Sequence, residues 1–311
     1  MKRLAGVTGS LAVMGLLAAT SVAEAQSARA WAEAKNALPA GPTILVGINL
    51  DTIRTSEIYK KFVPAFIDKE NDLKEGLGMV KEKCAIDATG VIQGIVVAMD
   101  EKEKGVVFVS LKGVDETAAM DCLTKVAAAK DPKVKISAKK TGNIIEYTST
   151  KDKEKLYVAW LGKDVIAIAT DPNDPAQLKK MLGGGGALAK SPEFARALGK
   201  VNTNAALWGV VVKADDLGPM KMKLAYGSAD VSGGKISAEG NVVGGSAKEV
   251  KDAAAMFTKE LENSKKGGGV PPALQGALNS VKINAVGDVL VVTGSIAEKD
   301  VLGLLQTFMP R

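Results

Sequence analysis

The chain has 311 residues, a formal net charge of +6, 46% hydrophobic and 4% aromatic residues, and no histidine. Its hydrophobic content excludes a disordered chain. The missing histidine excludes a Ser-His-Asp triad, a Cys-His dyad, a His-ligated zinc and a proximal haem ligand, and it removes the commonest general base near neutral pH.

The first 25 residues have the pattern of a cleavable signal peptide. Met1–Arg3 is a short positive segment, an apolar run follows from Leu4 to Val22, and Ala23-Glu24-Ala25 places small residues where signal peptidase requires them. The alternative is a retained membrane anchor, whereas a lipoprotein would need a cysteine at the cleavage site. No later segment has the ~18 consecutive apolar residues that span a bilayer. We therefore predict cleavage after Ala25, no transmembrane segment in the mature chain, and a periplasmic or secreted location.

The first half of the mature chain predicts both strands and helices. Residues 26–42 form a lead-in segment that contains Trp31, and Thr43–Ile48 is a buried strand. A long helical stretch follows, which Pro64 should kink or divide, and helix resumes from about residue 72 to residue 84. The next predicted strands are 91–99, 106–111, 144–148, 156–161 and 165–170, and predicted helices begin after the caps Asp115 and Asp174.

A glycine-rich break at 183–186 and a short helix beginning at Ser191-Pro192 lead into the second half. Its predicted strands are 207–213, 221–231, 235–243, 281–286 and 289–293, and one helix follows the cap Ser246 while another closes the chain. Along 235–243, apolar or small residues at even positions alternate with Ser237, Glu239 and Asn241. One face of that strand is therefore expected to contact water.

These elements predict an α+β protein with mostly antiparallel sheet and helices packed on one face. The order strand, hairpin, helix, hairpin, helix occurs twice, which indicates two similar halves built by structural duplication. The expected organisation is a signal peptide at 1–25, a lead-in at 26–42, a first half at 43–183, a glycine-rich hinge with a short helix at 184–204, and a second half at 205–311. The halves could form one continuous sheet or two domains.

The two cysteines, Cys84 and Cys122, both lie on apolar helical stripes. Outside the cytoplasm such a pair is more often a disulfide than a site, so we predict a bridge, with two buried free thiols as the alternative. Two cysteines without histidine cannot make a structural zinc site. The sequence thus predicts neither a metal site nor a cofactor.

Several short patterns resemble catalytic or binding motifs but have simpler explanations. Gly184–Ser191 is one residue short of a P-loop, yet it follows a helix, so we interpret it as a flexible hinge. Asp171–Asp174 lacks the glycine and distant glutamate of an EF-hand and is explained as a turn with a helix cap. Ser137–Lys140 and Ser232–Lys235 match Ser-x-x-Lys but do not lie on a helix, as that motif requires.

Two further groups of residues have alternative roles. Asp215-Asp216 follows a predicted strand, where a carboxylate pair could serve a histidine-independent hydrolase, although the same pair suits an ordinary loop. Trp160 and Trp208 lie on predicted strands, and we expect them to anchor the core rather than stack on a ligand. The sequence therefore predicts no catalytic residue.

The charged residues are mostly lysines interleaved with aspartate and glutamate. We interpret them as a solvated surface, with attraction to an anionic envelope polymer or lipid headgroup as the alternative. Scarce arginine and the absence of a basic stripe with stacking rings argue against nucleic acid as a partner.

Two segments carry a family resemblance. One is the helix that runs into Cys84-Ala85-Ile86-Asp87 before the strand at Val91, and the other is Leu182–Gly199. Together they resemble uncharacterised exported proteins of Gram-negative bacteria, and the first half does so more than the second. The resemblance implies an envelope location and brings no activity or site residue.

The leading hypothesis is a non-catalytic, exported protein that binds an envelope protein, a polymer or another molecule. The alternative is a carrier of a lipid or other apolar ligand, because the strands 92–99, 106–111 and 165–169 are apolar on both faces. Helices or the other half of the protein could also cover both faces. A hydrolase is the third and weakest hypothesis.

Overall fold

The computed structural model describes residues 29–150, 155–267 and 270–308. The predicted signal peptide and its cleavage site lie outside these residues. No helix in the described ranges is long and apolar enough to cross a membrane.

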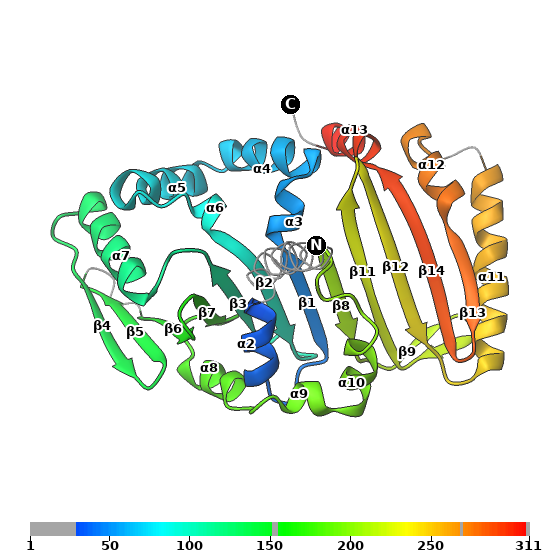
Figure 1. Ribbon diagram of the computed structural model, residues 1–311, viewed down its shortest axis with the longest axis horizontal. Coiled ribbons are helices and arrows are strands. Elements are labelled where there is room, and N and C mark those ends of the chain that lie inside the picture. The colour runs from blue at the N-terminus through cyan, green and yellow to red at the C-terminus, as the bar shows by residue number, and fades with distance from the viewer. Residues whose placement is uncertain (1–28, 151–154, 268–269, 309–311) are drawn as a thin grey trace, which may run out of the picture.

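A single antiparallel sheet of twelve strands organises the described residues (Figure 1). Its strands, in spatial order, are β13 (Lys282–Val286), β14 (Val289–Ala297), β12 (Lys235–Val243), β11 (Leu224–Ser232), β8 (Leu207–Val211), β1 (Ile44–Asn49), β2 (Ile92–Met99), β3 (Gly105–Leu111), β7 (Val165–Ala169), β6 (Lys155–Leu161), β5 (Ile144–Ser149) and β4 (Ile136–Thr141). The short strands β9 (Asp215–Leu217) and β10 (Met220–Met222) pair separately.

Alternating side chains give this sheet two different faces. We call the side that carries Leu45, Phe108 and Trp208 the core face, and the opposite side, which carries Val46, Val109 and Leu290, the reverse face. The described helices are α2 (Arg29–Ala37), α3 (Leu50–Arg54), α4 (Glu57–Lys69), α5 (Asn71–Cys84), α6 (Ala88–Val91), α7 (Glu116–Lys130), α8 (Pro175–Leu182), α9 (Ala187–Lys190), α10 (Pro192–Leu198), α11 (Ala247–Lys266), α12 (Pro272–Ser280) and α13 (Glu298–Phe308).

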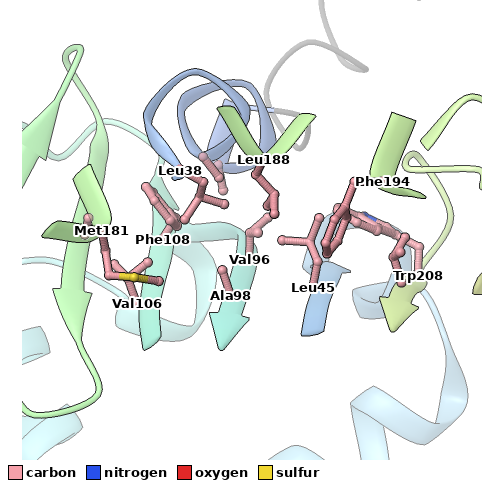
Figure 2. Close-up of a cluster of buried hydrophobic side chains, with 14 of the residues drawn as sticks. Leu38, Leu45, Val96, Ala98, Val106, Phe108, Met181, Leu188, Phe194 and Trp208 are labelled. Atoms are coloured by element: carbon pink, nitrogen blue, oxygen red, sulfur yellow. The ribbon is translucent and has the colours of Figure 1, made fainter. Parts of the chain in front are cut away.

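The main hydrophobic core lies on the core face, under α2, α8, α9 and α10 (Figure 2). Trp208 is its largest fully buried side chain. Its ring occupies the space beside Gly47 on the neighbouring strand β1, and Trp31 of α2 meets it edge-on with ring centroids 5.1 Å apart. Both predicted tryptophan anchors are buried, because Trp160 is also only 7% exposed.

Two smaller clusters lie on the reverse face, one near each end of the sheet. Near β4 to β7, α7 covers a cluster that includes Ile145, Val158 and Trp160. At the other end, α11 covers a cluster in which Val250 and Ala253 pack against Leu290. The helices therefore cover different faces in different parts of the sheet.

The structure confirms the predicted α+β class and antiparallel sheet, but its helices pack against both faces rather than one. Each half contributes a single strand and then two hairpins, and the last strand of the second hairpin lies beside the first hairpin. In the first half these are β1, β2–β3 and β6–β7. In the second half they are β8, β11–β12 and β13–β14. Duplication as the origin of this order stays a prediction. Pairing of β1 with β8 makes the two halves one continuous sheet.

Local sequence explains where several helices begin. The side chains of Asp115, Asp174 and Ser246 accept hydrogen bonds from backbone N–H groups in the first turns of α7, α8 and α11, as predicted. Pro175 occupies the first turn of α8, where its missing N–H costs nothing. Pro64, in contrast, lies inside α4 without dividing it, and the break falls at Glu70 instead.

The glycine-rich segment predicted as a hinge packs tightly against the end of α2. Gly184 donates its N–H to the carbonyl of Ala37, and a Cβ at this position would lie 2.0 Å from the backbone nitrogen of Pro39. Leu188 of α9 is fully buried. The glycine at 184 therefore permits a close backbone approach.

We expect Gly47→Ala to destabilise the fold because its Cβ would lie 2.1 Å from the Trp208 ring. Overpacking of this kind costs roughly 1–3 kcal/mol in the free energy of unfolding, which urea denaturation measures.

Gly78→Ala is the matched control for this substitution, because a Cβ there meets no atom within 4 Å on helix α5. Its expected effect is neutral or a gain of up to about 1 kcal/mol. Equal unfolding midpoints for the two variants would contradict the packing described for Trp208.

Candidate functional site

The middle of the reverse face carries apolar side chains that are not fully buried. The five adjacent strands β11, β8, β1, β2 and β3 form its floor. Of the described helices, α3 and α6 meet this region at the strand ends, while α7 and α11 pack towards opposite ends of the sheet. Because neighbouring strands lie about 4.8 Å apart, the floor is roughly 20 Å wide.

The side chains of this floor are all apolar or absent, and none is buried. We call it the reverse-face groove, and it consists of Ile44, Val46, Ile48, Ile95, Val97, Met99, Val107, Val109, Leu207, Gly209, Val211, Ala225, Gly227, Ala229 and Val231. On β1, β2 and β3 the opposite, core-face side chains are largely or fully buried. These strands are thus apolar on both faces, as the sequence indicated, yet only one face is packed.

A row of glycines across neighbouring strands makes the groove deeper along one line. Gly209, Gly227 and Gly240 lie directly opposite one another on β8, β11 and β12. A hollow of about 210 Å³ lies over Gly209 and Gly227, and Val46, Leu207 and Ala229 also line it. Leu207 is 45% exposed there, although leucine side chains are usually buried.

The predicted disulfide joins helices α5 and α7. Cys84, the last residue of α5, is bonded to Cys122 in the middle of α7, which confirms the bridge. Helices α4 and α5 contain no buried residue, and α5 contacts α7. The bridge therefore fixes α5, which has no buried residue, to α7.

At the amino-terminal end of α4, a buried carboxylate attaches this helix to α13. Glu298 of α13 is 4% exposed and accepts hydrogen bonds from the backbone N–H of Glu57 at 2.7 Å and of Ile58 at 3.3 Å. A carboxylate at a helix N-terminus satisfies its free N–H groups and complements the helix dipole. Sequence analysis missed this residue because its partners lie 241 positions away, so no local pattern reveals it.

The carboxylate pair considered for a hydrolase lies elsewhere. Asp215 and Asp216 are exposed on β9, opposite Met222 and Lys221 of β10. Asp215 accepts a hydrogen bond from the N–H of Asp216 at 2.9 Å, which is ordinary loop geometry. The two carboxylates are adjacent in the chain, and within the described residues they belong to no cluster of three acidic groups that could hold a metal ion.

The other sequence patterns also have structural roles. Asp171 and Asp174 accept hydrogen bonds from nearby backbone N–H groups in a turn that leads into α8. Ser137–Lys140 lies on the edge strand β4, and Ser232–Lys235 forms the turn between β11 and β12. Neither pattern places its serine and lysine on a helix.

No family model matches this sequence, and no curated protein matches it. Among solved structures, crystal form III of TP0453 is similar at 9% identity and a TM-score of 0.48, over 87% of this chain and 96% of that chain. Crystal forms I and IV of TP0453 are each similar at 10% identity and a TM-score of 0.46, covering 88% and 86% of this chain and 96% and 94% of those chains.

We expect removal of the disulfide to lower stability substantially. The bridge closes a loop of 38 residues, and the chain-entropy relation gives about 4 kcal/mol for a loop of this length. The double variant Cys84→Ala/Cys122→Ala should show that loss in the free energy of unfolding, measured by urea denaturation.

Reductant provides the control for this variant. It should shift the unfolding midpoint of the unchanged protein towards that of the double variant and leave the variant itself unaffected. A midpoint that stays the same on reduction would contradict a stabilising role for the bridge.

Proposed function

We propose that this protein is an exported, non-catalytic binding protein of the cell envelope that holds an apolar ligand, the acyl chain of a lipid, in the reverse-face groove. The observation that carries the proposal is a floor of five adjacent strands whose reverse-face side chains are apolar and not buried. Contiguous apolar area of this kind commonly marks a site that another molecule covers.

The chemistry of the floor favours an acyl chain over a polar ligand. The residues that make up the reverse-face groove offer no hydroxyl, amide or charged side chain, so a polar ligand would lose its water contacts without replacement. Burial of apolar surface gives roughly 25 cal/mol per Å², and a long unbranched chain offers that surface along its whole length.

The glycine row favours a narrow ligand. Missing side chains at Gly209 and Gly227 leave a trough lined by larger aliphatic groups such as Val46 and Leu207, and Gly240 continues the glycine row on the next strand, β12. A rigid helix of about 10 Å diameter would rest on the flanking side chains, whereas a flexible chain can enter the trough.

Export and the lack of catalysis rest on other features. The signal-peptide pattern, the Cys84–Cys122 disulfide and the resemblance to exported proteins support an oxidising compartment. The absence of histidine from the sequence and the ordinary loop geometry of Asp215-Asp216 give no support to a hydrolase.

Native mass spectrometry tests the proposal directly. The protein is exported with its own signal into a bacterial periplasm and purified without detergent. We expect extra mass that disappears on denaturation and that lipid analysis identifies as acyl-chain lipid. A bare protein mass, or a bound species without an acyl chain, would contradict the proposal.

Filling the trough should weaken binding of a fluorescent long-chain fatty acid. A Cβ at Gly240 meets no atom within 4 Å, and one at Gly209 makes only ordinary contacts at 3.5 Å or more, so the first carbon that Gly209→Val/Gly240→Val adds at each position meets no clash. We expect an affinity at least about tenfold lower, equivalent to about 1.4 kcal/mol.

Ser137→Val is the control for the groove-filling variant, since it adds a similar apolar group on the exposed edge strand β4. It should bind the fatty acid as the unchanged protein does. Equal affinity of the control and the groove-filling variant would place the fatty acid elsewhere.

A further inference from the structure

The second half of the sheet has an uncovered area on the core face, opposite to the side that α11 covers. In the first half, α2 and α8 bury the core face, and α10 extends this cover to β8 and β11. On β12, β14 and β13, α11 packs instead on reverse-face residues such as Leu290. Helix α12 contacts β14 and brings Ser280, its last residue, to the rim of this area.

Polar side chains occupy this uncovered area in two transverse rows. Strand register places Ser228, Glu239, Thr293 and Lys282 opposite one another on β11, β12, β14 and β13, and Asp230, Ser237 and Ser295 in the adjacent row. We call these residues the polar grid. They line a hollow of about 580 Å³, and Lys235 lies at its end.

The hollow continues along the strands towards α10. A second hollow of about 290 Å³ shares Glu239 and is also lined by Tyr226, Asn241 and Lys200. At its edge the Arg196 guanidinium contacts both carboxylate oxygens of Asp288 at 2.9 Å and lowers the pKa of that carboxyl. Arg196 and Asp288 thus satisfy each other and define one end of the polar surface.

The carboxylates of the grid are held in place while its hydroxyls are free to bind. Asn241 donates its side-chain N–H to Glu239 at 3.0 Å, and Asp230 accepts from the N–H of Ala206 at 3.0 Å. By contrast, the hydroxyls of Ser228, Ser237 and Thr293 have no hydrogen-bond partner within the described part of the chain. Each such hydroxyl can donate one hydrogen bond and accept two.

The grid differs from an ordinary solvated sheet surface in its side chains. The exposed edge strand β4 carries the long, flexible Lys139 and Lys140, which keep a surface soluble and protect the edge. The grid instead has short hydroxyl side chains, which lose little conformational freedom on binding and leave the hollow open.

We propose that the polar grid binds a neutral saccharide chain. Its two acidic residues, Asp230 and Glu239, are balanced by Lys235 and Lys282, so the surface favours an uncharged ligand over an anion or a cation. Hydroxyl and carboxylate groups at the spacing of neighbouring strands match a ligand that offers many hydroxyls. The continuation into the second hollow gives room for several linked sugar units.

A peptide is a poorer match for this surface. Extended peptides usually add to a sheet through the free backbone groups of an edge strand. The grid lies on a sheet face, where the backbone groups of β12 and β14 are already paired with their neighbours. Recognition there must come from side chains, which suits hydroxyl groups of a sugar.

The test is a backbone-amide NMR titration of the mature protein with maltohexaose and chitohexaose as neutral probes. A heparin hexasaccharide is the anionic probe and a hexapeptide of Gly and Ser is the peptide probe. We expect at least one neutral saccharide to shift the amide signals of residues 228–239 and 282–295. No shift with either neutral saccharide, or stronger binding of the anionic or peptide probe at these residues, would overturn the proposal.

Variants locate the binding to the grid. Thr293→Val keeps the shape of the side chain and removes its hydroxyl, and Glu239→Gln keeps the size and removes the charge. Together they should weaken saccharide affinity about tenfold or more. The groove-filling variant Gly209→Val/Gly240→Val should retain its saccharide affinity. Loss of binding on the core face is thereby distinguished from loss of binding on the reverse face. Unchanged affinity in Thr293→Val/Glu239→Gln would also overturn the assignment.

Discussion

Pairing between β1 and β8 is the interaction on which the rest of the structure depends. It joins strands that are about 160 residues apart and makes two short sheets into one. The pairing is stabilised at its centre, where Trp208 lies over Gly47 and meets Trp31, so that a tryptophan from the second half is buried among residues of the first. A bulky residue at 47 would separate these strands, because a side chain there would overlap the tryptophan ring.

A continuous sheet with helices on alternate sides necessarily leaves areas uncovered. The core face is buried in the first half, and the reverse face is covered near both ends of the sheet. What remains is an apolar area in the middle of one face and a polar area in the second half of the other. The residues match this arrangement, since Ser237 and Glu239 lie in the polar area while Val46 and Val97 lie in the apolar one. The polar area is compatible with water, whereas the apolar area costs free energy until another molecule covers it.

Local patterns predicted much of the fold and little of the site. Caps at Asp115, Asp174 and Ser246, and the alternation along 235–243, follow from interactions within a few residues, so sequence analysis located them. The pattern along β2 also indicated that both faces are apolar, but not that only one would be packed. The glycine row depends on register between β8, β11 and β12, and the attachment of α4 to α13 depends on Glu298. Contacts between distant segments have no periodic signature, which is why the sequence did not reveal them.

The cap on α4 also constrains the order in which the chain can fold. A protein that emerges from its amino terminus forms local hairpins and helices first, and distant contacts later. Helix α4 begins at residue 57, but the carboxylate that completes its first turn belongs to Glu298, close to the other end of the chain. The amino-terminal half therefore cannot reach its final state alone. Until residue 298 has been synthesised, the N–H groups of Glu57 and Ile58 lack this carboxylate, so α4 gains its last first-turn hydrogen bonds only when the chain is almost complete.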